Sequence, residues 1–359
     1  MKHLDCLHIV SERVVLKNQK TGKEVEFLLR PYRKGDEDGI AECVKGEYGE
    51  SYFKPQFYDK DQIIKNAESM RYDFFVAQAE GKIAGMEIFS YFQSGGDDYV
   101  EPASQILSRE FRGYGLSKVM VKYTFRILEK LEPSANFVHA VTFHAFTQST
   151  CERMGMVPVG FRLGRFLTER MVNSYPKGRC DKYSEGILIR PVRKKDAGTV
   201  YLPKELYAYG KKIYDRLGIW YQIKTEPEGD VAPCMEKGEY SITTDEKQCF
   251  TSVNIIQYGK DLKDRMEELI RDYRKERYWC IQIVLCCDDQ TVFRQYEQMK
   301  EIGFFFTGLK PLCGAHEQFY MQWLDDWELC MEDYVLTDSF KELRADILSF
   351  YEKRRGFPE

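Results

Sequence analysis

The stretch REFRGYGLSKVM, residues 109–120, is the most informative part of the N-terminal half. Gly113 and Gly115 come directly before a run in which apolar residues recur at three- and four-residue spacing as far as Pro133. That spacing predicts an amphipathic helix. Glycines before a helix let several backbone N–H groups point to one spot, where the helix dipole adds positive potential. The stretch therefore predicts a cup for a phosphate or pyrophosphate, or else only a tight turn.

Strand and helix signals alternate on both sides of this loop. Apolar, β-prone runs predict the strands 24–31, 72–79, 82–92, 98–107, 136–144 and 156–167. Helical spacing predicts the helices 35–44, 59–70 and 146–154 in addition to the one after the loop. Glu80 and Gly81 separate two of the strands and predict a hairpin.

Composition limits the classes of function. The chain has 359 residues, which exceeds one ordinary core, so two domains are expected. Its formal net charge of -4 and the lack of a basic stripe in the sequence argue against nucleic acid as a partner. Charged residues interrupt every apolar stretch near the N-terminus, so we expect neither a signal peptide nor a membrane span, and a cytoplasmic protein.

The eleven cysteines are scattered and show no CxxC spacing. Cys286 and Cys287 form the one close pair, and they lie on an apolar run. We interpret the cysteines as reduced, mostly buried thiols rather than disulfides. Because none of the five histidines lies near a cysteine pair, no metal site is expected.

In this context, residues 24–170 resemble the GNAT superfamily of acyl-CoA-dependent N-acetyltransferases. The family consensus (Q/R)xxGx(G/A), which holds the pyrophosphate of coenzyme A, falls on Arg112, Gly113, Tyr114, Gly115, Leu116 and Ser117. Serine departs from the last position of the consensus but is still small. RPYRKGD (30–36) and CERMGM (151–156) resemble two further family segments. The resemblance implies an α/β (α+β) fold with a mixed, mostly antiparallel twisted sheet flanked by helices.

The resemblance also implies attack of a neutral amine on the thioester of acetyl-CoA, with no metal involved. Backbone N–H groups at a strand bulge near Leu107 and Ser108 would bind the oxyanion and the pantetheine arm. Glu101 is the predicted general base, and the alternative is a solvated glutamate at the start of a strand. Glu87 and His144 are the reserve candidates.

The general acid is where the sequence departs most from the family. Family members often carry a tyrosine that protonates the leaving thiolate, and Cys151 occupies the aligned position. A cysteine could donate this proton. The alternative is a buried structural cysteine, with solvent or another residue as the proton donor.

The second half repeats part of the first. IRPVRKKD (189–196) matches LRPYRKGD (29–36) at most positions, and residues 279–312 repeat the strand, helix, glycine and strand order. The corresponding loop, QYGKD (257–261), has one glycine and no arginine, and Asp261 would place negative charge where phosphates bind. This half is therefore predicted to be a degenerate, structural copy.

These inferences predict a GNAT domain over 1–172, a linker over 173–185, and a degenerate GNAT-like domain over 186–359 that ends in an amphipathic helix. The predicted activity is acetyl transfer from acetyl-CoA to a primary amine of a small molecule or peptide, by direct attack in a ternary complex. The alternative is a non-catalytic acyl-CoA sensor or interaction module. The chain would act as a monomer or a homodimer.

Overall fold

The computed structural model describes residues 9–50, 52, 54–69, 72–94, 97–168, 181–193, 198–229, 231–233, 235–275, 279–311, 317–325, 327 and 329–354. Contacts divide the described residues into two units, the first ending at Val138 and the second beginning at His139. None of the helices within these ranges has the length and apolar character needed to cross a membrane.

The first unit is built on a mostly antiparallel sheet. Its strands are β1 (Glu12–Lys17), β2 (Glu24–Pro31), β3 (Tyr72–Ala79), β4 (Lys82–Ser94) and β5 (Asp97–Leu107), followed by β6 (Ala135–Val141), which continues into the second unit. They are neighbours in this order, with antiparallel pairing up to β5 and parallel pairing between β5 and β6. The predicted fold class, a mixed and mostly antiparallel sheet flanked by helices, is confirmed.

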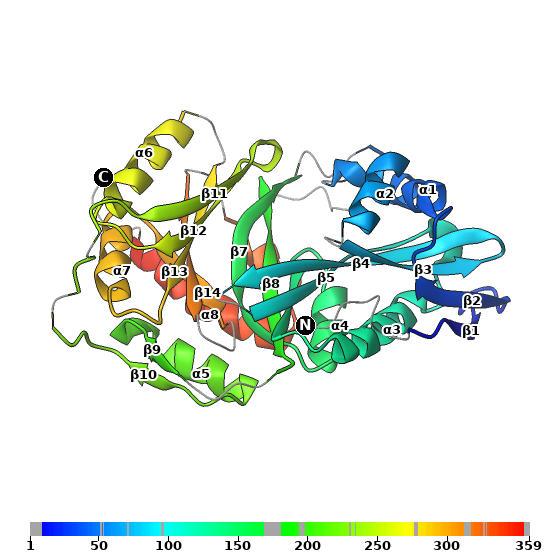
Figure 1. The fold of residues 1–359 in the computed structure, drawn as a ribbon, viewed down its shortest axis with the longest axis horizontal. Helices are drawn as coiled ribbons and strands as arrows, with labels where there is room; N and C mark the ends of the chain where they lie inside the picture. The colour runs from blue at the N-terminus through cyan, green and yellow to red at the C-terminus, as the bar shows by residue number, and fades with distance from the viewer. Residues whose placement is uncertain are drawn as a thin grey trace. The chain divides into compact units, whose positions relative to one another are not determined.

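Helices cover both faces of this sheet. Figure 1 shows α1 (Glu37–Tyr48) and α2 (Lys60–Glu68) on one face and α3 (Leu116–Leu131) on the other. The core under α1 and α2 consists of buried apolar residues from both helices and from β3, β4 and β5, among them Ile40, Val44, Ile63, Phe74, Met86, Ile88 and Ile106. The apolar stripe of α3 is buried as its sequence spacing predicts, at Met120, Tyr123, Ile127, Leu128 and Leu131.

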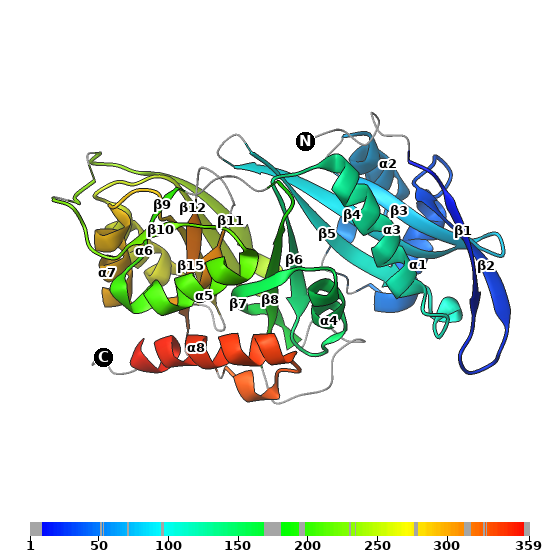
Figure 2. The same ribbon diagram turned by 90° about the horizontal axis from the view of Figure 1, so that it is seen from below.

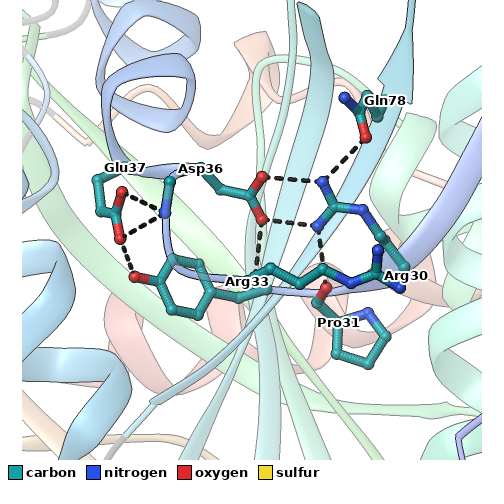
Figure 3. A network of polar contacts seen from close by, with 8 residues as sticks. Arg30, Pro31, Arg33, Asp36, Glu37 and Gln78 are labelled. Carbon is teal, nitrogen blue, oxygen red and sulfur yellow. Dashed lines mark hydrogen bonds and ion pairs between the residues drawn. The ribbon is translucent and has the colours of Figure 1, made fainter. Parts of the chain in front are cut away.

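The junction between β2 and α1 is held by a buried ion pair, which Figure 3 shows from close by. Arg30 is 3% exposed, and its two Nη atoms donate to the carboxylate of Asp36 at 2.6 and 2.8 Å. The same guanidinium donates to Gln78 on β3, while Asp36 also accepts from the N–H of Arg33. The RPYRKGD segment thus holds the turn into α1, because a bidentate pair fixes both groups in one geometry.

The described residues of the second unit contain nine further strands and five α-helices. Its strands are β7 (Val157–Leu167), β8 (Lys182–Pro191), β9 (Thr199–Tyr201), β10 (Gln222–Lys224), β11 (Glu239–Asp245), β12 (Phe250–Gln257), β13 (Cys280–Cys286), β14 (Phe305–Lys310) and β15 (Gln318–Leu324). Its helices are α4 (Phe146–Arg153), α5 (Tyr207–Leu217), α6 (Leu262–Tyr273), α7 (Val292–Glu301) and α8 (Asp338–Arg354). The strand order is β8-β7-β14-β15-β13-β12-β11, while β9 and β10 form a separate parallel pair.

The later strands repeat the connectivity of the earlier ones. In β11-β12-β13-β15-β14, the parallel pair β12 and β13 is connected through α6, and the last strand, β15, inserts beside β13. The earlier order β4-β5-β6-β8-β7 has the same pattern, with α3 between the parallel strands and β8 inserted beside β6. The two series therefore have the same strand connectivity over these five strands.

The division by contacts differs from the predicted boundary. The RP motif at 190–191 was expected to open the second copy, yet it ends β8, which pairs with β7 from Val157↔Ile189 onwards. β8 is thus the closing strand of the first series, because it lies between β6 and β7 in the strand order. Residues 173–180 of the predicted linker lie outside the described residues, and residues 182–185 belong to β8.

The predicted C-terminal helix is confirmed as α8. Figure 2 shows it, in red, running beside α5. Phe340 packs on Phe161 of β7 and Phe350 on Phe306 of β14, each with ring centroids 5.3 Å apart. Ion pairs from Lys212 on α5 to α8 complete the contact. The apolar face of α8 is therefore buried against this sheet.

Candidate functional site

The loop between β5 and α3 has the backbone that its glycines predict. Gly113 has a φ of +87° and Gly115 a φ of +74°, both in the region that side chains disfavour. An ideal Cβ on Gly113 would lie 3.1 Å from Nδ2 of Asn18, whereas one on Gly115 would meet no atom within 4 Å. Gly113 is therefore needed both for its positive φ and because a side chain would crowd Asn18. Gly115 is needed only for its positive φ.

The N–H groups of residues 113–117 find no hydrogen-bond acceptor within the described part of the chain. The N–H of Lys118 is the next along the chain, and it donates to the carbonyl of Gly115 at 3.2 Å. The first turn of α3 carries no acidic residue. Unpaired N–H groups at a helix N-terminus, together with the helix dipole, form an anion-binding site.

The β1–β2 hairpin braces this loop from one side. The N–H of Gln19 donates to the carbonyl of Gly113 at 3.1 Å, and Nδ2 of Asn18 donates to the carbonyl of Arg112 at 3.1 Å. Two carbonyl oxygens of the loop are therefore occupied by the hairpin. The sequence did not lead us to expect β1, so it gave no sign of this support.

The side chains of the predicted binding residues hold the loop in place. Tyr114 is 8% exposed and packs edge-on against Phe27, with ring centroids 5.5 Å apart, and Leu116 is buried in the core. Oγ of Ser117 donates to Oε1 of Gln105 at 2.5 Å. These three side chains pack in the core or bond to β5. A bound anion would therefore contact the main chain at these positions.

Arg112, at the start of the loop, is paired with Glu47, a residue that no sequence motif pointed to. Its guanidinium contacts Oε2 of Glu47, near the end of α1, and Nε of Arg109 lies 3.5 Å from the same oxygen. The Glu47 side chain is 17% exposed, while that of Arg112 is 53% exposed. Any phosphate that binds Arg112 must therefore compete with Glu47 or share the guanidinium.

β5 leaves its parallel neighbour soon after it begins. The pairs with β6 are Tyr99↔Ala135 and Val100↔Asn136. Beyond Val100, the register gives β5 no further partner on β6. β5 and β6 therefore diverge beyond Val100.

The bulge of β5 lies earlier than predicted. The register with β4 shifts between Met86 and Ile88, and Ser104 has a φ of +53°, so the extra residue lies at Ser104 and Gln105. The predicted position was wrong, because Leu107 pairs with Gly85 and the N–H of Ser108 donates to the carbonyl of Ala84 at 2.9 Å. These two residues are regular ladder positions.

A lysine reaches this bulge from the segment between α1 and α2. Nζ of Lys54 donates to Oγ of Ser104 at 3.0 Å and lies 5.7 Å from the ring centroid of Phe57. The carboxylate of Glu50 in the same segment pairs instead with Lys45. Positive charge is therefore present beside the bulge on the face that α1 and α2 cover.

The two candidate bases lie on opposite faces of the sheet. Glu101 is half-buried opposite Ser90, on the same face as Ala103, which packs under α1 and α2. Glu87 is 3% exposed and accepts from Thr124 of α3 at 3.3 Å, so it lies on the other face. Burial raises the pKa of Glu87 to about 7. Glu101 is thus the candidate on the face that α1 and α2 cover.

The remaining two candidates belong to the second unit. His144 follows β6, and its ring contacts those of Phe143 and Phe146 at 4.7 and 5.6 Å between centroids. Burial lowers its pKa, and its Nδ1 has no hydrogen-bond partner in the described ranges. Cys151 is 5% exposed in α4. Its burial fits the structural alternative considered for this cysteine.

The corresponding loop of the second series is filled by its own chain. Oδ1 of Asp261, at the N-terminus of α6, accepts from the N–H of Gly238 at 2.8 Å and from the hydroxyl of Tyr240 at 2.7 Å. The N–H of Lys260 donates to the carbonyl of Met235 at 3.0 Å. The Asp261 side chain makes no cap bond to α6, but it places a carboxylate at the N-terminus of this helix, where the first turn of α3 has no acidic residue.

Solved acetyltransferases show a likeness to part of this chain. The ribosomal-protein-S18-alanine N-acetyltransferase of Escherichia coli is 13% identical over 47% of this chain and 96% of its own, with a TM-score of 0.37. A putative acetyltransferase of Salmonella typhimurium, solved with its cofactor acetyl-CoA, is 14% identical over 48% of this chain and 97% of its own, with a TM-score of 0.38. A GNAT superfamily phosphinothricin acetyltransferase of Sinorhizobium meliloti, in complex with acetyl-CoA, is 18% identical over 45% and 86%, with a TM-score of 0.36.

No model of a known protein family matches the chain, and no curated protein matches it. Within the described ranges, no group of three or more His, Cys, Asp or Glu side chains could hold a metal ion.

Proposed function

We propose that the chain is an N-acetyltransferase that moves an acetyl group from acetyl-CoA to a primary amine of a small molecule or peptide. The observation that carries this proposal is the run of N–H groups from residue 113 to residue 117, which have no acceptor among the described residues at the N-terminus of α3. N–H groups in this position, at a helix N-terminus, suit a diphosphate. Two left-handed glycines support the backbone of this loop.

The separation of β5 from β6 supports the same reaction. A pantetheine arm is an extended chain with amide groups, and it could pair with the backbone of β5 beyond Val100 as a strand would. The bulge at Ser104 then lies where the thioester would be held, and Lys54 supplies positive charge beside it. In this account the amine attacks the thioester carbonyl directly, and the coenzyme A thiolate leaves.

Glu101 is the proposed general base, because it lies on the face that α1 and α2 cover and is only half-buried. A carboxylate in this setting can take the proton of the attacking amine, directly or through water. Glu87 and His144 remain the reserve candidates for the base. Since the Cys151 thiol is buried, we propose that solvent protonates the leaving thiolate.

We further propose that the two series of strands are a tandem pair and that the second one does not bind coenzyme A. The Asp261 carboxylate at the N-terminus of α6 supports this proposal, because its negative charge would repel a diphosphate. The role proposed for the second copy is structural.

Release of free thiol from acetyl-CoA, measured with a panel of primary amines, tests the activity. Replacing Glu101 with glutamine is expected to lower kcat about 100-fold while leaving the Kd for acetyl-CoA unchanged, because one base is removed and the cup is retained. Glu80→Gln is the matched control, since Glu80 pairs with the exposed Lys23 instead. Binding of acetyl-CoA without turnover across the panel would favour the non-catalytic sensor, and full turnover by the Glu101 variant would remove its assigned role.

The pairing of Glu47 with Arg112 predicts a variant that binds coenzyme A more tightly than the wild type. Replacing Glu47 with glutamine should tighten coenzyme A binding about three- to tenfold, because the guanidinium then meets the diphosphate without a competing charge. The gain should shrink as salt is added, since half-exposed charges are screened. Calorimetric titration of both proteins at two ionic strengths measures this effect, and weaker binding by the variant would show that Glu47 supports the site instead.

A further inference from the structure

Beneath the bulge of β5 lies a polar cluster that the reaction described above does not use. Its centre is Gln105, the residue after Ser104. Nε2 of Gln105 donates to Oε2 of Glu87 at 3.1 Å and to the carbonyl of Ser117 at 3.3 Å. Its Oε1 accepts from Oγ of Ser117 at 2.5 Å. One side chain on the bulge thus makes three contacts, with β4 and with the first turn of α3.

Glu87 extends the cluster under α3. The hydroxyl of Thr124, which is fully buried, lies 3.3 Å from Oε2 of Glu87. Burial is the main reason that the pKa of Glu87 is raised to about 7, and the bonds from Gln105 and Thr124 partly oppose it. A buried carboxyl group of this kind lowers the folding stability when it ionises. An apolar side chain at this position would not carry that penalty.

The groups that face Glu87 from its neighbouring elements are neutral. Gln105 faces it from β5 and Thr124 from α3, while Phe75 lies opposite on β3. Tyr123 of α3 packs edge-on against Phe75, and burial raises its pKa to about 12, so it stays protonated near neutral pH. Ionisation of Glu87 near neutral pH would therefore introduce a charge among neutral neighbours.

The cluster connects two parts of the proposed site. Ser117 belongs to the loop whose N–H groups form the anion cup, and Gln105 belongs to the bulge beside the thioester position. We propose that Gln105 is a positioning residue that fixes the bulge of β5 against the N-terminus of α3, with Glu87 holding the Gln105 amide in place. The diphosphate and the acyl carbonyl of one acyl-CoA would then be held at matched positions. This inference rests on the proposed function.

The test uses the full-length protein with coenzyme A and with acetyl-CoA labelled at the thioester carbonyl. Gln105→Met removes all three contacts while keeping the side-chain length. Gln93→Met is the control, because Gln93 is exposed on β4 and donates to Asp98. Calorimetry gives the Kd for coenzyme A, and isotope-edited infrared spectroscopy gives the carbonyl stretch of bound acetyl-CoA. The second readout reports the hydrogen bond at the bulge and needs no acceptor amine.

We expect the wild type and Gln93→Met to lower the carbonyl frequency on binding, and Gln105→Met to lose this shift while its Kd for coenzyme A stays within about threefold. In the wild type, the shift should change between about pH 6 and pH 8 as Glu87 ionises. In Glu87→Gln it should be constant over this range, because the group that titrates is gone.

The outcomes separate the two proposals. A wild type without affinity for acetyl-CoA overturns the proposed function and this inference with it. The positioning role alone is overturned by a pair of results. The wild type binds acetyl-CoA with a shifted carbonyl frequency, and the Gln105→Met variant is folded and keeps the same shift. A pH-independent shift in the wild type removes the part assigned to Glu87.

Discussion

Replacing Gly115 with aspartate is expected to weaken acetyl-CoA binding by about 100-fold or more, because like charges brought together cost several kcal/mol. Gly115 is the N-cap of α3 and has a φ of +74°, and an ideal Cβ there meets no atom within 4 Å. Aspartate tolerates this conformation better than most residues, so the loop should keep its shape. What changes is the charge at the site of the N–H cup.

Gly81 provides a matched control for this substitution. It has a φ of +77° in the β3–β4 turn, and its ideal Cβ likewise meets nothing within 4 Å. Gly81→Asp therefore introduces the same side chain with similar backbone strain, away from α3. Calorimetry with acetyl-CoA should find wild-type affinity for Gly81→Asp and near-complete loss for Gly115→Asp. Equal affinities in the two variants would mean that the cup does not hold the diphosphate.

Replacing Gly308 with alanine is expected to destabilise the second unit by about 3 kcal/mol or more, because overpacking against rigid backbone cannot be relieved. Gly308 of β14 pairs with Gly160 of β7, and its φ is +149°. An ideal Cβ on Gly308 would overlap Cα of Gly160 and lie 2.6 Å from the carbonyl oxygen of Val159. These are main-chain atoms of the neighbouring strand, so the strands would have to separate.

For a unit of this size, we expect the melting temperature to fall by about 6–12 °C. Differential scanning calorimetry measures the change. Gly198→Ala is the matched control in the same unit, since its ideal Cβ meets nothing within 4 Å and its φ is not in the left-handed region. A Gly308→Ala variant that melts with the wild type would contradict the close approach of β7 and β14.

Local pattern predicted most elements of the fold. The predicted strand 24–31 coincides with β2, and the helix after the glycine loop ends before Pro133 as expected. Both depend on residues that are neighbours in the sequence, where propensity and periodicity act directly. The left-handed conformations of Gly113 and Gly115 were likewise predictable from the local sequence, because few residues other than glycine adopt them.

What could not be predicted depends on pairing between distant residues. The bulge at Ser104 follows from the register of β5 against β4, and the sequence of β5 alone does not fix that register. The pairing of Glu47 with Arg112 joins residues that are far apart in the chain, as does the bond from Gln105 to Glu87. The RP motif at 30–31 ends β2 and the RP motif at 190–191 ends β8, so this motif alone does not place a domain boundary.

The stoichiometry of acetyl-CoA binding tests the central claim most directly. Isothermal titration of acetyl-CoA into the full-length protein should fit one site per chain, because the first loop leaves its N–H groups without acceptors among the described residues and Asp261 places a negative charge at the second. Absence of binding would contradict the cup before α3. Two sites per chain would contradict the account of the second copy.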